Sequence, residues 1–116
     1  MNINGVLLKL DISNENDLNR YRQCLNGLCE GFDEIKDTKA ISNKYKEAFY
    51  AMVICSFFDE LFGNGTREKL FGDKPYYYRC FNALKQLHNE VINQKKDMRG
   101  LIIKFPSEKL LDHGRR

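Results

Sequence analysis

Four cysteines and two histidines are the residues of this sequence best suited to nucleophilic or metal chemistry. The cysteines stand at positions 24, 29, 55 and 80, and the histidines at 88 and 113. A catalytic thiol needs a positioned base, usually histidine, but His113 lies near the end of the chain and His88 beside the apolar stripe of a predicted helix. Cys24 and Cys29 are separated by four residues, not by the two of a zinc knuckle. We expect reduced, buried thiols, no metal or other cofactor, and no enzymatic activity.

Neighbouring carboxylates and a glycine-rich loop are the remaining candidates for chemistry. Asp59 and Glu60 are adjacent, so on a helix they point in different directions. The loop from Gly63 to Thr66 precedes a predicted helix, as anion-binding turns do, but it lacks a Gly-Lys-Ser/Thr ending and a preceding strand. We interpret the loop as a connector between helices.

The composition is that of one soluble globular domain. Of 116 residues, 42% are apolar and 30% charged, and a net charge of +3 arises from 19 basic and 16 acidic residues that are interspersed. Basic residues gather only toward the C-terminus, so nucleic acid is not the expected partner. The longest apolar stretch, residues 48–58, is well short of the roughly 20 residues that cross a bilayer, and no signal peptide opens the chain. We expect a cytoplasmic protein without a membrane partner.

The first twelve residues predict a β-hairpin. Asn4-Gly5 is the dipeptide that a type I′ turn favours, because both central residues need positive φ. Residues alternate with a period of two around this turn, with Lys9 and Asp11 on the polar side. The apolar side holds Met1, Ile3, Val6, Leu8, Leu10 and Ile12. Such a hairpin is marginal alone, so it must pack on helices or gain a strand.

Helical patterns fill the rest of residues 1–100, which we predict to be one globular domain. Ser13 is a suitable N-cap for the first helix, and Asp37 or Thr38 can open the second, which we expect other elements to surround because it is apolar on most sides. Gly27 and Gly31 either permit close approach of a neighbouring helix or mark where the first helix frays, and we favour fraying. The predicted helices span residues 14–32, 38–62, 66–71 and 74–98.

The predicted fold class is therefore mainly α, with an N-terminal β-hairpin packed on a bundle of three to four helices. Residues 101–116 form a C-terminal extension, in which 101–105 are β-prone, so this extension is either a strand or a mobile tail. Three consecutive tyrosines, 76 to 78, cannot face one direction, so at least one ring is exposed or contacts a partner.

The segment from Phe57 to Gly72 resembles a pattern, FFDxxFGxGTxxKxFG, in a family of small proteins from tailed bacteriophages and prophages. The opening Ile3-Asn4-Gly5 with its alternating strand is similar to the start of that family, and the resemblance covers roughly residues 1–92. Genes of that family lie among the tail morphogenesis genes, between those of the tail tube and the tape-measure protein. The resemblance implies a tail assembly chaperone or accessory protein in the cytoplasm of the bacterial host, with no catalytic residues to assign.

A tail chaperone would cover aggregation-prone helices of the tape-measure protein until tube subunits replace it, which requires exposed apolar surface. The candidate contacts are Tyr76, Tyr78, Leu101, Ile103 and Phe105. Two alternatives remain: a small phage protein that inhibits a host defence or regulatory protein, and a nucleic-acid-binding accessory protein. The sequence leaves open the oligomeric state, the partner, and whether the protein is in the finished virion.

Overall fold

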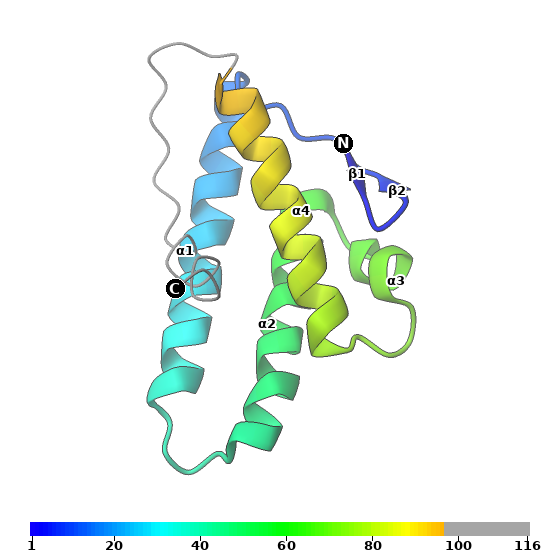
Figure 1. Ribbon diagram of the computed structural model, residues 1–116. Coiled ribbons are helices and arrows are strands. Elements are labelled where there is room, and N and C mark those ends of the chain that lie inside the picture. The colour runs from blue at the N-terminus through cyan, green and yellow to red at the C-terminus, as the bar shows by residue number, and fades with distance from the viewer. Residues whose placement is uncertain (97–116) are drawn as a thin grey trace.

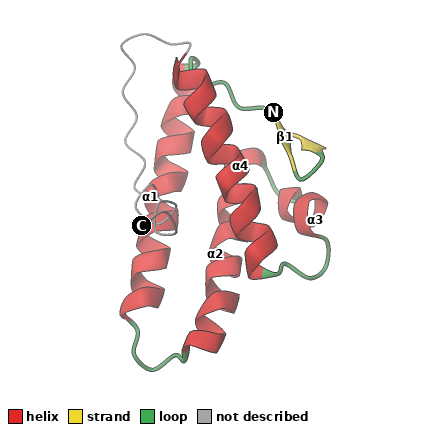
Figure 2. Cartoon of the chain, viewed as in Figure 1, coloured by secondary structure: helices red, strands yellow, loops and turns green. Residues whose placement is uncertain are grey.

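The computed structural model of the chain describes residues 1–96 and confirms the predicted fold class. A short hairpin precedes helices that pack around one core, so the protein is mainly α with an N-terminal β-hairpin packed on a helical bundle (Figure 2). The elements are β1 (Asn2–Ile3), β2 (Val6–Leu7), α1 (Glu15–Asp37), α2 (Asn43–Phe62), α3 (Thr66–Phe71) and α4 (Tyr77–Lys96). The β-prone segment 101–105 and the expected C-terminal extension lie outside the described residues.

Helix α2 is the central helix and packs on α1, α3 and α4. α1 and α2 lie side by side and antiparallel, and α4 begins about halfway along α2 (Figure 1). The contact of Tyr50 with Tyr77 and of Cys55 with Cys80 shows that α2 and α4 run in the same direction. The core side of α2 is formed by Ala51, Ile54, Cys55, Phe57, Phe58 and Leu61, all buried.

The hairpin turn is the predicted one. Ile3 pairs with Val6 across Asn4 and Gly5, whose φ values of 50° and 81° are both positive, as a type I′ turn requires. The hairpin is shorter than the twelve residues expected, since the last hydrogen-bonded pair joins Met1 to Leu8, at 2.9 Å in both directions. The alternation of burial nevertheless continues beyond it: Leu10 and Ile12 are buried while Lys9 and Asp11 are exposed.

Two glutamine side chains of α4 form hydrogen bonds with the N-terminal segment, in place of the strand-to-strand hydrogen bonds that a longer hairpin would have supplied. Gln86 accepts a hydrogen bond from the Asn4 backbone N–H at 2.9 Å and donates to the Asn4 side-chain oxygen at 2.8 Å. Gln94, two helical turns further, accepts from the Ile12 N–H at 3.0 Å and donates to the Leu10 carbonyl at 2.8 Å. The N-terminal segment is therefore fixed along α4 by side chains.

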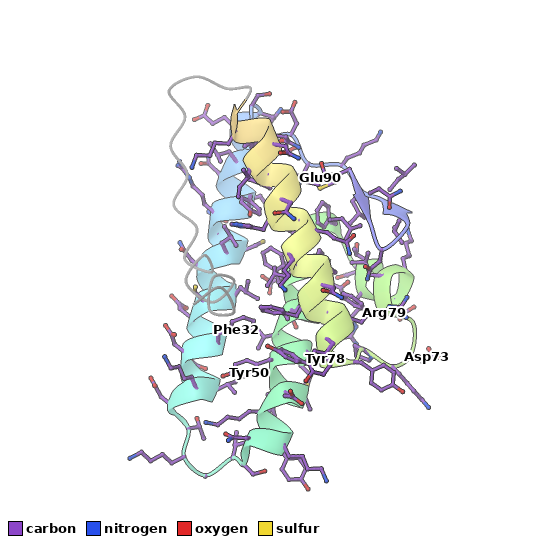
Figure 3. All side chains as sticks on the ribbon, viewed as in Figure 1. Phe32, Tyr50, Asp73, Tyr78, Arg79 and Glu90 are labelled. Carbon is purple, nitrogen blue, oxygen red and sulfur yellow. The ribbon has the colours of Figure 1, made fainter. Side chains whose placement is uncertain are left out.

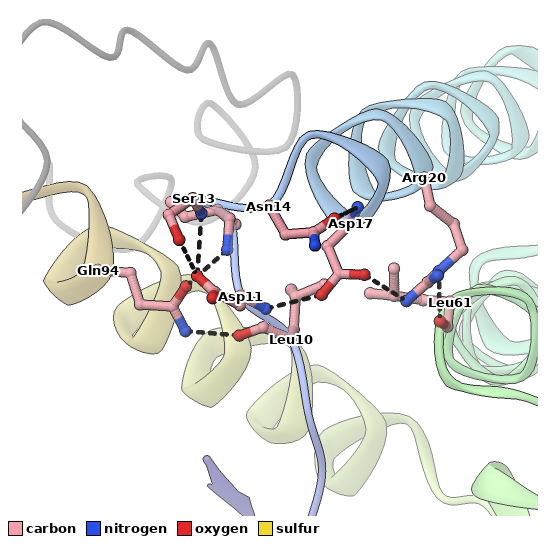
Figure 4. A network of polar contacts seen from close by, with 9 residues as sticks. Leu10, Asp11, Ser13, Asn14, Asp17, Arg20, Leu61 and Gln94 are labelled. Carbon is pink, nitrogen blue, oxygen red and sulfur yellow. Dashed lines mark hydrogen bonds and ion pairs between the residues drawn. The ribbon is translucent and has the colours of Figure 1, made fainter.

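The start of α1 is capped by Asn14 and not by the predicted Ser13. The Asn14 side chain accepts from the Asp17 N–H at 3.1 Å, while the Ser13 hydroxyl donates to Asp11 at 2.6 Å (Figure 4). Arg20 then forms an ion pair with Asp17 at 3.4 Å and donates to the Leu61 carbonyl at 3.0 Å. These contacts attach the start of α1 to the end of α2.

The expectation that α1 frays at its glycines is wrong, because the helix continues to Asp37. Gly31 permits close approach instead: a Cβ there would lie 3.0 Å from Cγ1 of Val53. At Gly27, in contrast, nothing lies within 4 Å of the position that a Cβ would take. Tertiary contact with α2 thus carries the helix past residues whose propensity is unfavourable.

The second and fourth helices begin later than predicted. Thr38 ends α1, with its hydroxyl donating to the Glu34 carbonyl, and Ser42 precedes α2 in an extended conformation. α3 has the predicted bounds. α4 starts at Tyr77, and the predicted start at residue 74 is disfavoured because the residue before a proline avoids helical geometry.

Candidate protein-binding surfaces

Only two of the five predicted contact residues lie in the described part of the chain. Tyr76 is 66% exposed and Tyr78 is 73% exposed, at the start of α4. Two residues apart, they point to different sides of the chain and form no common patch. Leu101, Ile103 and Phe105 lie outside the described residues.

Tyr78 belongs to a cluster of rings where α1, α2 and the start of α4 meet. Phe32 packs edge-on against Tyr50 at 5.0 Å between centroids, and Tyr50 lies 6.0 Å from Tyr77. The Tyr77 ring is 5.6 Å from the rings of both Tyr78 and Phe81. Figure 3 shows Phe32, Tyr50 and Tyr78 near one another in the lower half of the molecule. We call the partly exposed members, Tyr50, Tyr77, Tyr78 and Phe81, the aromatic surface.

Carboxylates border the aromatic surface on its α1 and α2 sides. Burial raises the pKa of Tyr50, and the charges of Asp33 and Asp37 raise it further. Burial and the charge of Glu47 likewise raise the pKa of Tyr77. At the far end, the ammonium of Lys85 lies 5.3 Å from the centroid of Phe81. Large rings beside negative charge suit a partner that carries both apolar and basic side chains.

Sequence reasoning missed Tyr50 as a member of this surface. Its signal was the spacing of four, three and four that joins Tyr50 to Ile54, Phe57 and Leu61 on one side of α2. That spacing places the ring on the inner side of the helix. Its partial exposure depends on α4, which begins only at the level of Tyr50.

Within residues 1–96, the helices that pack on α2 leave its opposite, apolar side exposed, contrary to the expectation that other elements surround this helix. Tyr45, Phe49 and Met52 are 61%, 41% and 59% exposed. Together with Ser56, these residues form what we call the outer face of α2. Beside it lies a hollow of about 410 Å³ between α1 and α2, lined among others by Gly27, Gly31, Phe49, Met52, Ser56 and Glu60. Gly27 contributes space to the hollow, because nothing lies within 4 Å of a Cβ built there.

Three of the four thiols are buried, as predicted. Cys24, Cys55 and Cys80 are buried, Cys29 is half-buried, and all four are free. The Cys55 and Cys80 sulfurs are 4.0 Å apart, and this hydrogen bond together with burial raises the pKa of Cys80. Burial also raises the pKa of Cys24 and of Cys29, so these thiols stay protonated at neutral pH. His88 is buried on α4.

The glycine-rich loop is a connector whose helix N-terminus already holds a carboxylate. Asp59 accepts a hydrogen bond from the Arg67 backbone N–H at 2.9 Å and forms a 3.8 Å ion pair with its guanidinium. The Thr66 hydroxyl donates to the Gly63 carbonyl at 2.7 Å. An internal anion therefore occupies the position that a bound phosphate would take at such a turn.

Residues 1–96 contain neither a candidate metal site nor a candidate membrane span. Within that range no group of three or more histidine, cysteine, aspartate or glutamate side chains is placed to hold a metal ion. Across the same range, no helix combines the length and the apolar character needed to span a bilayer.

Fold and surfaces together define a small helical protein with an N-terminal hairpin and two partly apolar exposed regions. The chain belongs to a family of unknown function, DUF6673, whose family model matches residues 4–116. No curated protein and no solved structure matches the chain.

Proposed function

We propose that this protein is an assembly chaperone or accessory protein of bacteriophage tails, which binds helical segments of the tape-measure protein. The aromatic surface is the observation that carries this proposal. Three tyrosines and a phenylalanine gather there, and their partial exposure leaves contact area for another chain. The similarity of residues 57–72 to the phage pattern supports the tail as the setting.

The borders of the aromatic surface indicate what kind of segment it would bind. Asp33, Asp37 and Glu47 lie close enough to the tyrosines to raise their pKa values. A helix with an apolar side flanked by lysine or arginine would place its methylene groups on the rings and its charges near these carboxylates. Exposed charge pairs are weak, so such binding is reversible, as release to tube subunits requires.

Co-expression with the tape-measure protein of the same phage tests the proposal. We expect a larger soluble fraction of the tape-measure protein and its co-purification with this chain. Tyr78→Ser should reduce the co-purified amount severalfold without unfolding the chain, because this ring is 73% exposed. Leu7→Ser, which removes an 82% exposed apolar side chain from the hairpin, is the matched control and should change nothing.

Charge reversal distinguishes the contribution of the bordering carboxylates from that of the rings of the aromatic surface. Glu47→Lys should weaken co-purification and make the remainder less sensitive to salt, because screening acts on the charge contacts only. Unchanged solubility of the tape-measure protein with no co-purification contradicts the proposal. Recovery of a host protein in its place would favour the alternative of an inhibitor of host defence or regulation.

A further inference from the structure

The outer face of α2 has the residue spacing of a helix that pairs with another helix. Tyr45, Phe49, Met52 and Ser56 follow one another at intervals of four, three and four, which is the seven-residue repeat of helix pairs. α1, α3 and α4 pack on the other sides of α2. Tyr45, Phe49 and Met52 therefore present a contiguous apolar stripe to the outside.

Charges at the two ends of α2 indicate the direction of the pairing helix. The helix begins with Lys44 and Lys46 and ends with Glu60, whereas the neighbouring Asp59 is already paired with Arg67 of the same chain. A second α2 in antiparallel orientation would place the basic start of one copy next to the acidic end of the other, twice. A parallel copy would place like charges together, which is unfavourable. The surface is thus complementary to itself in the antiparallel orientation.

We propose that two copies of this chain pair through the outer face of α2, antiparallel, with Met52 near the two-fold axis. Lys44 and Glu60 are each eight residues from Met52, so an axis at Met52 brings the ends of the two helices level. The same patch of both copies is then used, as a symmetric dimer requires.

The hollow beside α2 provides a place for an aromatic ring of the second copy. A two-fold axis perpendicular to two antiparallel helices leaves both α1 helices on the same side of the pair. Phe49 lines the hollow and so leans toward its own α1. Phe49 of the second copy leans toward that side as well. Because Phe49 is three residues from Met52 at the axis, its ring in the second copy comes level with Ser56 and Gly27 of the first copy. Those residues line the hollow and leave room for a ring, since nothing lies within 4 Å of a Cβ built at Gly27.

The dimer does not rest on the proposed tail function. Tyr50 and Met52 are two positions apart on α2 and point to opposite sides of the helix. The aromatic surface thus stays accessible when two copies pair, and either proposal can fail alone.

Substitutions at Met52 test the symmetric contact directly. Sedimentation velocity of the full chain over a range of concentrations should show a monomer–dimer equilibrium. Met52→Glu and Met52→Lys should each weaken dimerisation at least tenfold, because two like charges meet at the axis. An equimolar mixture of the two variants should dimerise again, since opposite charges then meet. Met52 is 59% exposed, so both variants keep the fold, which circular dichroism verifies.

A second variant tests the hollow. Gly27→Leu fills the hollow from its own helix and should weaken dimerisation without loss of helical signal, because the added side chain enters open space. Tyr78→Ser is the control and should dimerise like the wild type. A wild-type chain that stays monomeric at the highest concentration overturns the proposal. The proposal is also overturned if either Met52 variant dimerises by itself like the wild type, or if the equimolar mixture of the two variants stays monomeric.

Discussion

Two glycines of α1 provide a controlled comparison of helix propensity with tertiary packing. Gly27 and Gly31 lie four residues apart inside the same helix, so replacement by alanine gains about 1 kcal/mol of helix stability at either site. Their surroundings differ: a Cβ at Gly27 meets nothing within 4 Å, while one at Gly31 lies 3.0 Å and 3.2 Å from the two methyl carbons of Val53.

We expect Gly27→Ala to stabilise the protein by about 1 kcal/mol and to raise Tm by roughly 4–8 °C. At Gly31 the same gain is offset by overpacking, which costs about 1–3 kcal/mol. Gly31→Ala should therefore be neutral or destabilising, and less stable than Gly27→Ala by about 1–3 kcal/mol. Urea unfolding followed by circular dichroism measures the unfolding free energy of both alanine variants. Every variant also carries Met52→Glu, so that dimerisation does not contribute.

A double-mutant cycle identifies the contact responsible. Val53→Ala removes the methyl groups that the new Cβ would meet, so the cost of Gly31→Ala should shrink by about 1 kcal/mol or more in that background. Two results would refute the reasoning: equal stabilisation by alanine at both glycines, or strict additivity of the Gly31 and Val53 substitutions.

Three further outcomes are expected. Gln86→Ala should cost about 1–3 kcal/mol of unfolding free energy by removing both hydrogen bonds that Gln86 forms with Asn4, and hydrogen exchange should speed up at the Asn4 amide. Burial raises the pKa of Tyr21, so above its ordinary value of about 10 the unfolded chain releases a proton that the folded chain keeps. Unfolding free energy should therefore fall as the pH rises through this range, and less steeply in Tyr21→Phe, as urea titrations at several alkaline pH values would show. Asp59→Ala should speed hydrogen exchange at the Arg67 amide, since the carboxylate that accepts from it is lost, whereas Glu60→Ala should leave that amide unchanged.

Local features of this fold follow directly from the sequence. The Asn4-Gly5 turn and the bounds of α3 are set by residues whose backbone preferences act over a few positions. Phe32 lies four residues after Leu28 and Leu84 lies three residues before Leu87, the spacing of one helical side, and all four side chains are buried. Errors of one to five residues at helix starts have a local cause as well, because several neighbouring side chains could cap each helix and geometry selects one.

Non-local features could not be obtained in this way. Propensity at Gly31 argues for an end to α1, and only the neighbouring Val53 shows why glycine is used there. The role of Gln86 and Gln94 in holding the N-terminal segment involves contacts 82 to 84 residues apart in sequence. No short pattern specifies such a pair, because an exposed glutamine on a helix has the same local sequence signal.

A mainly helical class with an N-terminal hairpin can be predicted from the sequence, because turn chemistry and hydrophobic period are properties of a few adjacent residues. Tertiary structure alone decided which sides of α2 are covered. Tyr50 and Met52 each belong to a stripe of α2 with the spacing of four, three and four, so the sequence does not show which of the two stripes other helices cover. That distinction depends on where neighbouring helices begin and how closely they approach, and it defines both surfaces to which we assign binding.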